Sequence, residues 1–192
     1  MIRVYDAALP LYAAWSLESP VYTCMIVTQV YGNETRVIGS RHWENKPLHG
    51  CFNDVLQLFP WRHYHTHVTS PDADLVYAPQ FERFGWYCEA APDIKDTITL
   101  ARELFSTLKI DNTPRPWTAG NPNNDEFVNA LNQHSPSEQK MTDGFNVTPH
   151  HNLARYYSRA LELYAAWVHA GNAKPSALGP APNYAIWDRA VI

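Results

Sequence analysis

Hydrophobic and polar positions in the first quarter of the chain follow the patterns of β-strands. Residues 21–31 are rich in β-branched and aromatic side chains, and the turn dipeptide Gly32-Asn33 leads into a similar stretch at 35–44. A short dipeptide turn between two such stretches is typical of a hairpin. Together with residues 11–15, these segments predict three consecutive strands in an antiparallel meander.

Three later segments have the spacing of amphipathic helices. Residues 47–59 begin with a proline and repeat apolar side chains at helical intervals. A second helix is predicted after Asp93, which we assign as its cap, with an apolar stripe that continues to Leu108. The third helix is predicted over 149–169, because it starts with a proline and is followed by Gly171, a residue suited to a C-cap.

The middle of the chain alternates between strand and loop signals. Residues 62–69 and 84–90 predict a fourth and a fifth strand, and Ser70 to Asp74 between them is interpreted as a loop. A short helix is predicted at 125–134. Three meandering strands followed by strands that alternate with helices predict an α/β fold, with a mixed five-stranded sheet and helices on both faces.

Composition narrows the class of protein. The 192 residues carry a net charge of −4, with 45% apolar and 18% charged positions, which is typical of a folded globular chain. We predict one domain over 1–171 and a Pro- and Ala-rich tail over 172–192. No apolar run is long enough to span a membrane, and the three cysteines lack metal-type spacing, so we expect a cytoplasmic protein.

A more specific signal lies in the segment YDAALPLYAAW, from Tyr5 to Trp15. It resembles the opening of the nuclease domain of bacteriophage terminase large subunits. The similarity continues in chain order and covers about residues 5–165, through the segments 38–46, 63–72, 85–111 and 143–157. The resemblance implies a ribonuclease H-like fold. It also implies a site in which three carboxylates hold two Mg²⁺ or Mn²⁺ ions for phosphodiester cleavage.

The chain departs from that family at the three acidic positions. The resemblance places the first acid at Ser16, the second at Asp72 and the third at Asn152, so Asp72 is the only acid retained. Hard cations depend on carboxylate charge, and we therefore expect the site to be catalytically impaired. Glu18 is a candidate substitute, because it follows Ser16 by two positions and would share its side of a strand. Asp72 and Glu18 are then the predicted metal ligands.

Further groups near these positions have both an ordinary and a functional interpretation. Four side chains could complete a metal site: Asp74, Asp143, His150 and His151. The simpler interpretation is that these side chains lie in loops, cap a helix or are solvated. Cys88 has no basic neighbour that would mark a nucleophile.

Three histidines alternate along the fourth predicted strand, at positions 63, 65 and 67. Neighbouring members would lie about 6.5–7 Å apart, and the outer pair twice as far, which is too far for three ligands on one Zn²⁺. We interpret them as a half-exposed face of the strand.

Together these observations predict a pseudonuclease associated with phage or prophage DNA packaging, which binds DNA or a packaging protein without cutting. No G-x-x-x-x-G-K-[ST] motif occurs, so we expect no ATP site, and we expect no cofactor. Two alternatives stay open. One is a divergent Mg²⁺- or Mn²⁺-dependent endonuclease that uses Asp72 and Glu18. The other is a phage structural or interaction protein without a nucleic-acid role.

Overall fold

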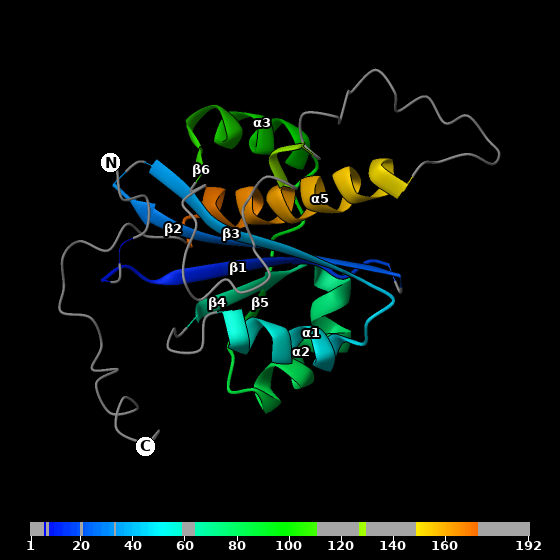
Figure 1. Cartoon of the computed structure of the whole chain (residues 1–192). Helices are drawn as coiled ribbons and strands as arrows, with labels where there is room; N and C mark the ends of the chain where they lie inside the picture. The colour runs from blue at the N-terminus through cyan, green and yellow to red at the C-terminus, as the bar shows by residue number, and fades with distance from the viewer. Residues whose placement is uncertain are drawn as a thin grey trace.

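A six-stranded mixed sheet forms the centre of the molecule, and helices cover both of its faces (Figure 1). The structure, a computed structural model, describes residues 6, 8–19, 21–32, 34–58, 64–110, 127–129 and 149–172. Its elements are β1 (Leu11–Ser16), β2 (Tyr22–Tyr31), β3 (Glu34–Glu44), α1 (Leu48–Leu58), β4 (Tyr64–Thr69), α2 (Pro71–Arg83), β5 (Cys88–Ala90), α3 (Thr97–Thr107), β6 (Lys109–Ile110) and α5 (Pro149–His169).

The strand order in the sheet is β5-β4-β1-β2-β3-β6. Strands β1, β2 and β3 are antiparallel neighbours, with Ser16 opposite Cys24, so the predicted meander is confirmed. Strand β4 runs parallel to β1, and β5 runs parallel to β4. This order is that of the ribonuclease H-like fold, which confirms the predicted class. The sheet has one strand more than the predicted five, because the two-residue β6 pairs with the edge of β3.

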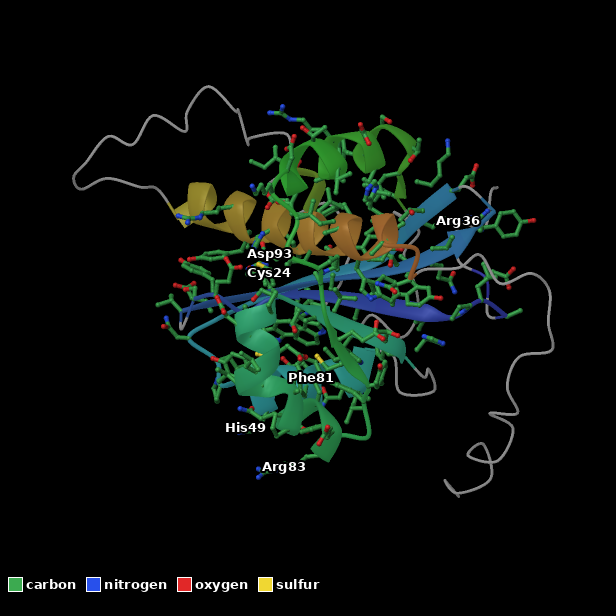
Figure 2. The ribbon with its side chains drawn as sticks, turned by 180° about the vertical axis from the view of Figure 1, so that it is seen from behind. Cys24, Arg36, His49, Phe81, Arg83 and Asp93 are labelled. Atoms are coloured by element: carbon green, nitrogen blue, oxygen red, sulfur yellow. The ribbon has the colours of Figure 1, made fainter. Side chains whose placement is uncertain are left out.

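The central strand β1 is buried on both sides, and its alternating side chains belong to two separate cores. Tyr12 and Ala14 join the cluster that includes α5, whereas Ala13 and Trp15 join the cluster that includes α1 and α2. Figure 1 shows α3 and α5 on one face of the sheet and α1 and α2 on the other. In Figure 2, Phe81 lies in the lower helical layer, as its membership of the second cluster requires.

Helix α2 was not predicted, because Ser70 to Asp74 were interpreted as a loop. Pro71 stands in the first turn, where the missing N–H would have no helical partner in any case. The Ser70 hydroxyl caps this turn by accepting a hydrogen bond from the Ala73 amide at 3.3 Å. Asp72 and Asp74 therefore lie in the first turn of a helix and not in a loop.

The remaining helices follow the predictions with one correction. Helix α3 starts four residues later than Asp93, and its cap is Asp96, whose carboxylate accepts from the Thr99 amide at 3.1 Å. Helix α5 has the predicted bounds, and Gly171 follows it with a φ of +82°, the left-handed conformation expected of a C-cap glycine. Of the predicted helix 125–134, residues 127–129 are described, and they are helical.

The predicted tail lies outside the described residues from position 173 onward, so the domain boundary stays a prediction. In the part of the chain that the structure describes, no helix has the length and apolar character needed to cross a membrane.

Candidate functional site

A cleft of about 480 Å³ opens where β1 and the parallel strands β4 and β5 end. The carboxyl ends of parallel strands are the usual place for ligands in sheets of this kind. The cleft combines three carboxylates with one guanidinium, and its lining consists of Leu17, Glu18, Ser70, Pro71, Asp72, Ala73, Tyr77, Asp93 and Arg159.

Asp72 lies at this cleft because helix α2 begins directly after β4. Ser70 ends the strand segment and caps the helix, so Asp72 is held in the first turn. A carboxylate in the first turn of a helix is stabilised by the amide dipoles there. Its side chain is exposed to solvent, in keeping with a place on the wall of an open cleft.

Glu18 reaches the same cleft, and it is paired with a cation from α5. Its Oε1 accepts a hydrogen bond from Nε of Arg159 at 2.6 Å. The other side of the guanidinium meets Oε2 of Glu162 at 3.3 Å, and this oxygen also accepts from the Thr97 hydroxyl at 3.2 Å. Burial lowers the pKa of Arg159, but the hydrogen bonds and charges of Glu18 and Glu162 outweigh it and raise the pKa above its ordinary value.

Ser16 is the last residue of β1 and is completely buried. Its hydroxyl oxygen has no hydrogen-bond partner among the described residues, and Ser16 is not among the residues that line the cleft. Asn152 is a residue of α5, but its side chain lies outside the described part of the structure. The structure thus brings Asp72 and Glu18 into one cleft, and the predicted convergence with Ser16 and Asn152 stays a prediction.

The further candidates lie apart from this cleft or outside the described residues. Asp74 is in α2 but does not line the cleft. Position 143 lies outside the described part of the chain, and positions 150 and 151 are helical, with side chains outside it. Burial raises the pKa of the Cys88 thiol to about 12. The hydrogen bond to the Thr69 hydroxyl lowers this pKa, and the nearby carboxylate of Asp74 raises it. Such a thiol stays protonated and is a poor nucleophile.

The residues of the cleft do not fit the two-cation site that the resemblance implies. Ser16, at the position of the first acid, has a buried neutral hydroxyl in place of a carboxylate. Glu18, the nearest carboxylate in the sequence, is hydrogen-bonded to Arg159. Within the described ranges, no group of three or more His, Cys, Asp or Glu side chains is placed to hold a metal ion.

Asp93 and Arg159 line the cleft, and the sequence interpretation missed both. Asp93 follows β5, and its position beside the sheet can be seen in Figure 2. The rule that carboxyl ends of parallel strands meet at one edge could have found it, if β5 had been placed beside β4. For Arg159, the only signal was its i,i+3 spacing to Glu162, which is also typical of an ordinary surface pair.

The histidines of β4 do not form the half-exposed face that was predicted for them. His65 is exposed, but His67 is completely buried, and its Nδ1 accepts a hydrogen bond from Nε1 of Trp15 at 2.9 Å. Its ring stacks on Trp86, with centroids 4.6 Å apart. Burial lowers the pKa of His67 to about 3. His67 is therefore a neutral core residue, and position 63 lies outside the described residues.

Comparisons with known proteins give likeness of fold alone. No family model and no curated protein matches the chain. Solved structures of the large terminase from the thermophilic bacteriophage D6E do resemble it. Its complex with ADP has a TM-score of 0.59 at 10% identity and covers 88% of this chain and 41% of the terminase. The complex with ATP-gamma-S has a TM-score of 0.56 at 12% identity and covers 82% and 42%.

A third structure of the same terminase, in crystal form 3, has a TM-score of 0.53 at 10% identity and covers 69% of this chain and 34% of the terminase. The chain therefore spans less than half the length of these terminases. Its fold is similar to that of part of a phage large terminase.

Proposed function

We propose that this chain is a non-cleaving, ribonuclease H-like protein of phage DNA packaging. The observation that carries the proposal is Ser16, a buried hydroxyl at the end of β1, where the resembled nucleases have an acid. Two-cation cleavage needs carboxylates that hold both ions, and a neutral hydroxyl supplies no charge. The likeness to part of a phage large terminase supports the packaging context.

The charge of the cleft favours a protein partner over DNA. Three carboxylates (Glu18, Asp72 and Asp93) against the single guanidinium of Arg159 leave the lining net negative. Protein surfaces that bind DNA neutralise phosphates with Lys and Arg, whereas this lining repels them. We therefore propose that the cleft side of the molecule contacts a packaging protein.

A divergent nuclease is the second candidate, and Asp93 favours it. Asp93 adds a third carboxylate to the lining of the cleft, although one of the three is paired with Arg159 and, among the described residues, they do not form a group placed to hold a metal ion. Such an enzyme would depend on Mg²⁺ or Mn²⁺ and would use Asp72 and Glu18, the two ligands predicted from the sequence.

The test is a cleavage assay on plasmid and linear duplex DNA with 5–10 mM Mg²⁺ or Mn²⁺, roughly the excess that saturates weak oxygen-ligand sites. We expect no cleavage by the purified chain. Cleavage that disappears in Asp72→Ala would overturn the proposal and establish the divergent nuclease. Cleavage that persists unchanged in Asp72→Ala would point to a contaminating nuclease.

The double variant Ser16→Asp, Asn152→Asp should bind Mn²⁺ more tightly than the natural chain, because it returns two anionic ligands.

A further inference from the structure

The guanidinium of Arg159 is the one basic group among the residues that line the cleft. It reaches the cleft from α5, and its side chain is 31% exposed. It is held from two sides, by Glu18 at 2.6 Å and by Glu162 at 3.3 Å. Thr97, at the start of α3, donates to the same oxygen of Glu162 and so fixes the second partner. The guanidinium is thus anchored and not a loose surface charge.

A cation in this position changes what the carboxylates can bind. Arginine stays protonated at every working pH, so its charge is permanent. It occupies Oε1 of Glu18, one of the two oxygens through which this carboxylate could bind a divalent ion. Its charge also repels any cation that approaches Asp72 or Asp93 on the same cleft.

We propose that Arg159 is a tethered cation that takes the place of a divalent ion in this cleft and excludes Mg²⁺ and Mn²⁺ from it. The proposal rests on the proposed function, because it concerns the same cleft. It gives the Glu18 carboxylate a permanent counter-charge that belongs to the chain itself. A second observation agrees with it: the buried hydroxyl of Ser16, two residues before Glu18, has no partner among the described residues and supplies no anionic ligand for a cation.

A purely structural role for the ion pair makes a different prediction. Partly exposed pairs contribute little to stability, so removal of Arg159 should leave the fold intact. If the pair were only structural, its removal would not change the affinity for cations. If Arg159 replaces a divalent ion, its removal should create a cation site.

The experiment measures Mn²⁺ binding to the full chain by electron paramagnetic resonance and by calorimetry. We compare the natural chain with Arg159→Ala, Arg159→Gln and Arg159→Lys. Arg159→Gln is included because its amide retains a hydrogen-bond donor for Glu18 if the alanine variant does not fold. The matched control is Arg155→Ala, which removes the same charge from an exposed position on the same helix. Thermal melting reports folding of each variant.

We expect Arg159→Ala and Arg159→Gln to bind Mn²⁺ at least about tenfold more tightly than the natural chain, because a repelling charge is gone in both. Arg159→Ala also releases Glu18 from its hydrogen bond. Arg159→Lys and Arg155→Ala should bind no more tightly than the natural chain. Adding Asp72→Asn to Arg159→Ala should reverse the gain.

A folded Arg159→Ala or Arg159→Gln with unchanged affinity would overturn the inference. So would a natural chain that already binds Mn²⁺ as tightly as the variants. Either result leaves the proposed function standing, as long as the natural chain does not cleave DNA. Cleavage by the natural chain would instead overturn the proposed function.

Discussion

Lowering the pH should destabilise the protein through one side chain, the imidazole of His67. The ring is completely buried between Trp15 and Trp86. Because Trp15 donates to Nδ1, the proton of the neutral ring is on Nε2, which has no acceptor among the described residues. A second proton would convert Nδ1 from an acceptor into a donor and would place a charge in an apolar core.

The size of the effect follows from the two pKa values of His67. Burial lowers the pKa from 6.5 to about 3 in the folded protein, so between these values the unfolded chain binds the proton and the folded chain does not. Stability is therefore fully present above pH 6.5 and falls as the pH falls, by about 1.4 kcal/mol per pH unit. Between pH 6.5 and 4.5 the loss from this one residue amounts to about 2.5 kcal/mol.

The assay is urea unfolding, followed by Trp fluorescence, at several pH values between 4.5 and 7. His67→Asn keeps an acceptor oxygen close to the place of Nδ1 but cannot be protonated, so its stability should fall less steeply with acid. The cavity it leaves lowers stability at every pH and does not affect the slope. His65→Asn, an exposed position on the same strand, should keep the slope of the natural chain. Equal slopes in the natural chain and His67→Asn would refute the reasoning.

Two further substitutions test the packing around the sheet. Ser70→Ala removes the hydroxyl that caps α2 and should lower the free energy of unfolding, measured in a urea titration, by about 1 kcal/mol. No loss would mean that the 3.3 Å hydrogen bond from the Ala73 amide to this hydroxyl contributes nothing to stability. Trp167→Phe removes the indole N–H that donates to Oε2 of Glu89 at 2.7 Å, and it should cost about 1.5–3 kcal/mol, because the acceptor is charged. Combining it with Glu89→Gln should show a loss smaller than the sum, and strict additivity would count against the bond.

The strands and α5 could be predicted because their patterns are long and regular. Residues 22–31 are rich in β-branched and aromatic side chains, and residues 34–44 follow them after the turn at Gly32. Helix α5 begins with a proline and is followed closely by Gly171. Helix α2 was missed because its two prolines are usually signs of a loop, and its apolar positions form no clear stripe. Strand β6 has two residues, too few for any periodicity.

The site could be predicted only in part, because half of it depends on tertiary structure. Glu18 and Asp72 were expected from the resemblance and the strand alternation, and the structure places both at one cleft. Arg159 lies 141 residues from Glu18 in the chain, and no local pattern links the two. The burial of His67 also depends on tertiary packing, since His65 lies two positions earlier on the same strand and is exposed.

The position of α5 on β1 has a consequence for how the chain folds during synthesis. The ring of Tyr12 lies 5.1 Å from that of Trp167, and the residues that α5 adds to this core include Tyr157, Leu161 and Tyr164. Contacts between segments so distant in sequence form late and slow the search for the native state. Until the ribosome has released α5, the side of β1 that packs against this helix lacks it, and nascent chains should need protection from aggregation up to that point.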